Sequence, residues 1–342
     1  MAGRHHGPET VRAANVPKVP DVNPWFWAVK VLTTAMGEAV SDFSVKEFNP
    51  YLAVFCGFVV FALALTWQFR VPDYRTWPYW TAVSMVAVFG TMVADAMHVG
   101  LGIPYKVSVT LFAVSLAVVL FVWYRTERTL SIHSITTRRR EVFYWLTVCC
   151  TFALGTATGD LTATTLHLGY FTSGVVFTLA ILIPLVAWRL GVNPVLTFWV
   201  AYILTRPIGA SFADFFGMPK SSGGLGIGHG PVSLVTVVLV VACVAYLAKT
   251  GKDQPTAADL AAAAEYAPPA GGGYGPPQPA YAPAPPPGYA AQQPPPPGYR
   301  QQPPPGYRQQ PPPPGRGPSF TPGPGYEQGQ DYDPYRGAPR RD

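Results

Sequence analysis

The segment WAVKVLTTAMGEAVSD, residues 27–42, begins on a tryptophan, reaches a glycine after ten positions and ends on an aspartate five positions later. The same spacing, W-x9-G-x4-D, occurs four times in the chain without change. Its members are Trp27, Gly37 and Asp42; Trp80, Gly90 and Asp95; Trp145, Gly155 and Asp160; and Trp199, Gly209 and Asp214. An aromatic residue directly precedes each tryptophan. Because a fixed repeat determines an architecture, we predict four copies of one structural unit.

Each unit has enough apolar sequence for two membrane-spanning helices of about 20 residues. The first helix of a unit is interrupted by Gly, Thr, Ser and acidic residues, and the second is uniformly apolar. The predicted spans are 24–43, 50–69, 78–98, 104–124, 142–161, 170–189, 195–214 and 231–248. Two spans return the chain to the same side, so the units are parallel repeats. The predicted fold is an all-α integral membrane protein with eight transmembrane helices in four two-helix repeats.

Composition and charge agree with a membrane protein. Hydrophobic residues make up 49% of the chain and charged residues 12%, whereas soluble domains have about 25% charged residues. Basic residues lie mainly before the first span, in the second, fourth and sixth loops and after the last span. By the positive-inside rule both termini are cytoplasmic. We expect a multi-pass protein of the cell inner (plasma) membrane, with an uncleaved first span and no nucleic-acid partner.

Three domains are predicted from these patterns. They are a cytoplasmic N-terminal segment (1–23), a membrane domain (24–248, with repeats at about 24–70, 77–125, 142–190 and 195–248) and a cytoplasmic tail (249–342). Most of the 39 prolines lie in the tail, in repeats such as PPPPGYRQQPPPGYRQQPPPPGRG, residues 294–317. Such a sequence is typical of disorder. The tail either solubilises the protein or binds a cytoplasmic partner, and a brief helical turn is expected before it at 257–264.

The segments KVLTTAMGEAVSDF (30–43) and FWVAYILTRPIGASFADFFG (198–217) resemble a known bacterial family. Its members are membrane proteins of unknown function built from four tandem two-helix repeats, each with a characteristic tryptophan. The resemblance covers residues 24 to about 248. It implies an integral membrane protein of bacterial type and no particular activity.

With the tryptophan as position 0, positions +7, +11 and +15 lie within about 60° of one another on one helix face. This face contains Trp27, Thr34, Glu38 and Asp42 in the first unit, and Trp199, Arg206, Ala210 and Asp214 in the fourth. The tryptophans, about 22 Å from the aspartates, are expected to anchor helix ends at the cytoplasmic headgroups; gating or ligand stacking is the alternative. The glycines are expected at helix–helix contacts.

A carboxylate within a span is costly and should face the protein interior or water. The aspartates therefore either cap helix ends at the outer interface or form a ring or pairs along an ion pathway. Glu38 lies about one turn deeper than Asp42. Arg206, deeper still, needs a partner from another unit, and we expect Glu38, either as a structural ion pair or as a gate. Lys30 is expected to extend its ammonium to the cytoplasmic interface.

Signals for metal or cofactor chemistry are weak. Asp95 and His98 lie three residues apart and could form half of a metal site, but no further ligands accompany them at fixed spacing. The four cysteines lie in apolar runs without metal-binding spacing and are expected to be buried. The membrane domain has no nucleotide-binding loop or hydrolase motif. We therefore expect no cofactor and no enzymatic activity.

The leading hypothesis is a secondary transporter or channel-like permease for a small cation or a proton-coupled solute. The first helix of each unit, here called the patterned helix, would line the pathway. The second, uniformly apolar helix, here called the plain helix, would lie outside, against the lipid bilayer. The pathway residues would be Glu38, Asp42, Asp95, Asp160, Asp214 and Arg206. Oxygen ligands favour a hard ion such as Mn²⁺ or Mg²⁺, or a proton. The alternative is a non-transporting scaffold or sensor whose proline-rich tail recruits a cytoplasmic protein.

Overall fold

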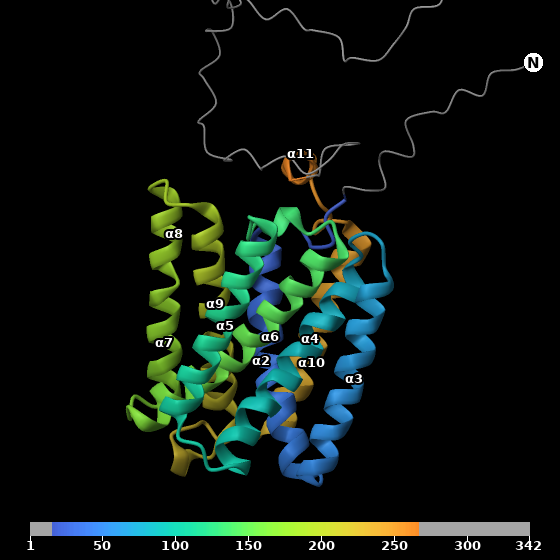
Figure 1. Ribbon diagram of the computed structural model, residues 1–342. Coiled ribbons are helices and arrows are strands. Elements are labelled where there is room, and N and C mark those ends of the chain that lie inside the picture. Colours follow the sequence, from blue (N-terminus) through green and yellow to red (C-terminus); the bar gives the residue numbers. More distant parts are fainter. Residues whose placement is uncertain (1–15, 267–342) are drawn as a thin grey trace, which may run out of the picture. The chain divides into compact units, whose positions relative to one another are not determined.

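The computed structural model describes residues 16–266, and over this range the chain is helical without strands (Figure 1). The helices are α2 (Pro24–Glu47), α3 (Pro50–Arg70), α4 (Thr76–Asp95), α5 (Tyr105–Glu127), α6 (Arg138–Asp160), α7 (Tyr170–Ala180), α8 (Leu182–Arg189), α9 (Pro194–Gly217), α10 (His229–Thr250) and α11 (Ala257–Glu265). Two π-helical segments, η1 (Ala96–Gly100) and η3 (Leu161–Thr165), and two 3₁₀ turns, η2 (Ile132–Ser134) and η4 (Lys220–Ser222), connect them. The all-α prediction is confirmed for this range. Of the predicted proline-rich tail (249–342), the part beyond residue 266 lies outside the described residues.

Three of the long helices begin with an Asn-Pro pair. The side-chain oxygen of Asn23 accepts hydrogen bonds from the backbone N–H groups of Trp25 and Phe26. Asn49 and Asn193 cap α3 and α9 in the same way. The proline that follows each asparagine occupies the first helical position, where an N–H would have no partner and a fixed φ suits the helix. The starts of these helices are therefore encoded locally.

The sixth predicted span, 170–189, is broken into two helices. α7 ends at Ala180 and α8 begins at Leu182. Pro184 has no N–H to donate to the carbonyl of Ala180, and its ring crowds that carbonyl. By contrast, α9 continues through Pro207. The other seven predicted spans each match one continuous helical segment.

Within residues 16–266, seven helical segments are long and apolar enough to cross a membrane, which suggests a membrane protein. α2 is not among them, because Lys30, Glu38 and Asp42 reduce its apolar content. Among the seven, α4, α6 and α9 bury 56–61% of their apolar window inside the protein, whereas α3, α5, α7–α8 and α10 bury only 17–28%. The second group therefore presents apolar side chains to the surroundings.

The patterned helices α2, α4, α6 and α9 form a closed ring, in which each contacts the next and α9 returns to α2. The contact is equivalent at every step: the repeat glycine of one helix faces position +7 of the next. The four contacts are Gly37 with Ala87, Gly90 with Phe152, Gly155 with Arg206, and Gly209 with Thr34. A Cβ atom on these glycines would lie only 1.9–3.0 Å from the neighbouring helix. The prediction that the glycines are helix contacts is confirmed.

The plain helices cover this ring with an offset of one unit. α3 packs on α4, α5 on α6, and α7 and α8 on α9, while α10 packs chiefly on α2. α3 and the α7–α8 pair lie on opposite flanks of the bundle in Figure 1. Each plain helix thus covers the patterned helix of the following unit. Since the last plain helix covers the first patterned helix, the repeat closes on itself.

Aromatic side chains fill one end of the ring, here called the aromatic end. The residue before each tryptophan contacts the tryptophan of the next unit, with ring centroids 5.7–6.2 Å apart. The pairs are Phe26 with Trp80, Tyr79 with Trp145, Tyr144 with Trp199, and Phe198 with Trp27. The hydroxyls of Tyr79 and Tyr144 also share a hydrogen bond of 2.6 Å. These aromatic contacts therefore join the four units in the same cyclic order as the glycine contacts.

The tryptophans themselves do not lie where the sequence analysis placed them. Trp80, Trp145 and Trp199 are only 1–4% exposed, and Trp27 is partly buried. The expectation that the tryptophans anchor helix ends at the headgroups is therefore wrong for Trp80, Trp145 and Trp199. An amphipathic ring at a helix end can pack on a neighbouring unit as well as on a headgroup. Here the preceding unit supplies that neighbour.

Segments at both ends of the described range pack against the aromatic end. The Lys18 ammonium binds Glu141 at 2.7 Å. Tyr74 donates a hydrogen bond to Asp253, and burial, together with the Asp253 charge, raises the pKa of Tyr74 above its usual range. The turn expected at 257–264 is confirmed by α11. The residues that follow the last long helix, up to residue 266, are thus ordered against the bundle.

Candidate cation site at the carboxylate end

Arg206 lies at position +7 of the fourth unit, at the centre of the ring and with no exposed surface. Its Nη2 donates to Glu38 Oε2 and to Thr156 Oγ1, both at 2.7 Å. It also donates to Thr91. Glu38, Thr91 and Thr156 occupy position +11 of the first three units, and the fourth unit has Ala210 there. The predicted Arg206–Glu38 pair is confirmed. Threonines of the second and third units accept further hydrogen bonds from the guanidinium, whose Nε has no partner among the described residues.

The carboxylates gather at the end of the ring opposite the tryptophans, here called the carboxylate end. They form two groups that share Glu38: Glu38, Asp42 and Asp95; and Glu38, Asp160 and Asp214. Within each group, one oxygen atom of every residue lies within 4.8 Å of the others. Oxygen ligands about 2.0–2.6 Å from one ion can be separated by such distances. The structure thus brings together all five acidic residues that the repeat singled out.

Asp42 is neutralised by basic groups of the protein itself. The Lys46 ammonium, one turn away on α2, binds its Oδ2 at 2.6 Å, and His229 Nδ1 of α10 lies 3.3 Å from the same atom. Lys46 Nζ also lies 2.7 Å from His229 Nε2. Since an ammonium can only donate, Nε2 is the acceptor and the imidazole proton is on Nδ1, facing Asp42. Asp42 therefore has one hydrogen-bond donor, the positively charged Lys46 ammonium, with the His229 imidazole beside it.

Asp95, Asp160 and Asp214 differ from Asp42 in this respect. Among residues 16–266, no hydrogen-bond donor and no basic group lies within bonding distance of their carboxylates. Asp214 is only 4% exposed. Removing an ionised carboxylate from water is expensive unless it is paired. Asp214 therefore requires a bound cation or a proton, whereas Asp95 and Asp160 keep partial access to water.

The backbone changes at two of these aspartates. α4 passes into the π-helical segment η1 directly after Asp95, and α6 passes into η3 directly after Asp160. Widened turns of this kind are frequent at functional sites. His98, the weak candidate ligand beside Asp95, is in neither group of three possible ligands found among the described residues. His98 Nδ1 instead lies 2.8 Å from the carbonyl oxygen of Ile103.

Lys30, at position +3 of the first unit, does not reach the interface and is only 1% exposed. Its ammonium lies 3.8 Å from the ring centroid of Phe152 and 4.1 Å from that of Tyr202. The guanidinium of Arg206 faces the same Phe152 ring at 5.6 Å. The expectation of an interfacial Lys30 is wrong, because position +3 belongs to the inward face. The helix face defined from the sequence comprised positions +7, +11 and +15. Extending that face by one turn, to position +3, would have included Lys30.

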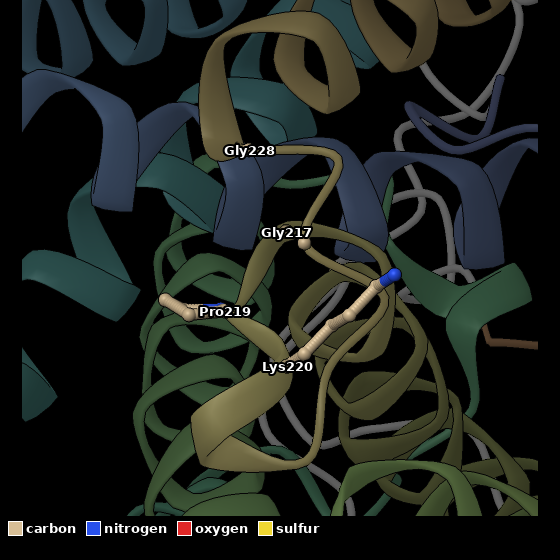
Figure 2. Close-up of a pocket in the computed structure, with 5 residues that line it drawn as sticks. Gly217, Pro219, Lys220 and Gly228 are labelled. Carbon is tan, nitrogen blue, oxygen red and sulfur yellow. The ribbon is translucent and has the colours of Figure 1, made fainter.

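A pocket of about 340 Å³ lies at the loop after α9 (Figure 2). Its lining residues are Gly217, Pro219, Lys220, Gly226 and Gly228. The side chains of Pro219 and Lys220 point to opposite sides of the loop in Figure 2. His229 follows the pocket directly, and a Cβ on Gly217 would lie 2.8 Å from its imidazole. The pocket therefore borders the histidine that contacts Asp42, rather than the unpaired aspartates.

These features define a class: a closed ring of four tandem two-helix units, apolar on its outer face, with uncompensated carboxylates at one end. A family model described as Repeat of Unknown Function (DUF347) matches residues 78–129, 143–190 and 197–253, which are the second, third and fourth units. The chain belongs to this repeat family of unknown function. The first unit lies outside the matched residues, although it has the same spacing and completes the ring. Comparison with curated proteins and with solved structures finds no match.

Proposed function

We propose that the protein is a multi-pass membrane permease that carries a small cation, or a solute coupled to protons, through the ring of patterned helices. The observation that carries this proposal is the set of three aspartates, Asp95, Asp160 and Asp214, that surround Glu38 without a counter-charge. Ionisable groups at such positions in membrane proteins mark ion pathways and proton relays. Their equal positions in successive units give the pathway its fourfold arrangement.

The axis of the ring is closed below the carboxylates. Glu38, Arg206, Phe152 and Lys30 follow one another towards the aromatic end, and each is at most 3% exposed. A continuously open pore would need water along this line. The packing instead supports a permease that alternates between conformations, in which the central side chains rearrange to admit the cation.

The proposed orientation follows from charge and apolar surface. Basic residues of the even-numbered loops lie at the aromatic end, together with Lys18, Lys249 and Lys252. This distribution supports an orientation with the aromatic end on the cytoplasmic side of the inner (plasma) membrane. The outer helices face the lipid. The carboxylate end then opens to the opposite side, where it meets cations before they enter the ring.

Flux into liposomes tests this proposal. Purified full-length protein is reconstituted, and entry of protons and of Mn²⁺ is followed with trapped fluorescent indicators. Asp95→Asn and Asp160→Asn are expected to lower flux about 10-fold or more while the protein elutes as a folded species. Glu47→Gln, an exposed carboxylate at the end of α2, is the control. Unchanged flux in both folded aspartate variants would refute the proposed pathway.

A further inference from the structure

The two carboxylate groups are equivalent in the repeat but not in their surroundings. The group with Asp42 already receives Lys46 and His229. The group of Glu38, Asp160 and Asp214 has no such neighbours beyond Arg206. Fourfold spacing therefore produces two candidate sites, of which the first is occupied by side chains of the protein.

The second group has an unpartnered acidic side chain directed into it. Asp214 is 4% exposed, and its carboxylate oxygen lies within 4.8 Å of oxygens of Glu38 and Asp160. Burial without a donor or cation is unfavourable. Glu38 can also contribute, because both of its hydrogen bonds, from Arg206 and Thr91, go to Oε2. Its Oε1 is then available to a ligand.

Charge and donor type select the ligand. Three carboxylates with one guanidinium have a net charge of −2, which a divalent cation neutralises and a monovalent cation does not. Ligands that are all oxygen favour Mg²⁺, Mn²⁺ or Ca²⁺ over Zn²⁺ or copper. Three protein oxygens leave room for bound water, as is usual for Mg²⁺.

We propose that Glu38, Asp160 and Asp214 bind one hard divalent cation, an inference that builds on the proposed function and names the ion class. Arg206 acts here as a positioning residue. It holds Glu38 towards the two aspartates through Oε2 and lowers the charge of the group from −3 to −2. The Asp42 side of the cluster stays closed to the ion, since Lys46 occupies it.

Mn²⁺ binding to the purified full-length protein in detergent, measured by the loss of the free-ion electron paramagnetic resonance signal, tests the inference. One Mn²⁺ per chain is expected, resistant to excess Na⁺. Asp214→Asn and Asp160→Asn each remove a proposed direct ligand and are expected to raise the dissociation constant by at least the roughly 10–100-fold typical of losing an outer-shell partner. Asp42→Asn should change it by much less, and Glu47→Gln should leave it unchanged.

The outcomes separate this inference from the proposed function. Absence of Mn²⁺ binding, two ions per chain, or equal weakening by Asp42→Asn and Asp214→Asn would overturn it. Since Asp214→Asn could misfold, the Mn²⁺ dissociation constant of Asp160→Asn provides a second test of the same group. Carboxylate-dependent proton flux without Mn²⁺ binding would leave the permease standing and refute the divalent site. Mn²⁺ binding without any flux would leave the divalent site standing and refute the permease.

Discussion

The closest helix contact in the ring gives the sharpest prediction. A Cβ added to Gly209 would lie 1.9 Å from Thr34 Oγ1 and 2.6 Å from the backbone nitrogen of Ala35. The Thr34 side chain could rotate away, but the Ala35 nitrogen is part of the α2 backbone and can move only with the helix. To reach ordinary van der Waals distance, α2 and α9 must separate locally by about 0.8 Å. Gly209→Ala therefore disturbs the helices that close the ring.

The expected loss of stability combines three contributions. Overpacking a tight contact costs about 1–3 kcal/mol. Displacing the Thr34 hydroxyl from the carbonyl of Thr205, which it meets at 3.1 Å, costs about 1 kcal/mol. Replacing glycine by alanine within a helix offsets this by about 1 kcal/mol. The net expectation for Gly209→Ala is a decrease of about 1–3 kcal/mol in the free energy of unfolding.

Two other glycines of the chain provide a graded comparison. A Cβ on Gly90 would lie 3.0 Å from Phe152 Cβ, with its next neighbour at 3.7 Å. Gly100 has nothing within 4 Å of that position. The losses should therefore rank Gly209→Ala above Gly90→Ala, with Gly100→Ala within about 0.5 kcal/mol of the unsubstituted protein.

The assay is unfolding in mixed micelles with increasing sodium dodecyl sulfate, followed by tryptophan fluorescence. The protein contains nine tryptophans, and the buried ones report on the ring. Refolding by dilution must recover the signal for free energies to be defined. If Gly209→Ala were as stable as Gly100→Ala, the close approach of α2 and α9 could not be what closes the ring.

Substitutions at three buried charged residues are tested with the same assay. Arg206→Met leaves Glu38 buried without its cation and should lower the free energy of unfolding by about 3–5 kcal/mol, whereas adding Glu38→Met should restore much of that loss; an equal or larger loss in the double variant would contradict the pairing. Lys30→Met keeps the apolar stem and removes a buried ammonium that lies against two aromatic rings and has no acidic partner among the described residues, so it should raise that free energy by about 1–3 kcal/mol. A clear decrease would show that the Lys30 charge stabilises the fold.

Local sequence features were sufficient for much of the ring. Apolar length and fixed spacing are properties of single segments, and they located the helices to within a few residues. The glycine contacts were predictable because a residue without a side chain permits close approach. The Arg206–Glu38 pair was predictable for another reason: a buried guanidinium needs a partner, and the +11 face offered one acid.

Other features depended on which units lie side by side. A tryptophan at a helix end suits a headgroup or a neighbouring aromatic ring equally well, and only packing showed that Trp145 meets Tyr79. The same holds for Lys30, whose length allows either an interfacial or an inward position. Nothing in the spacing distinguishes Asp42 from Asp214.

The sequence by itself determined four equivalent helices with a glycine contact and an acidic face, because periodicity acts within a helix. Only the tertiary structure decided that the repeat closes on itself, with α10 on α2. It also brought His229 of α10 to Asp42, while Asp214 has no side-chain partner among residues 16–266. These facts arise from contacts between residues more than 150 positions apart, where local preferences have no influence. The asymmetry of the carboxylate cluster is therefore a product of the fold.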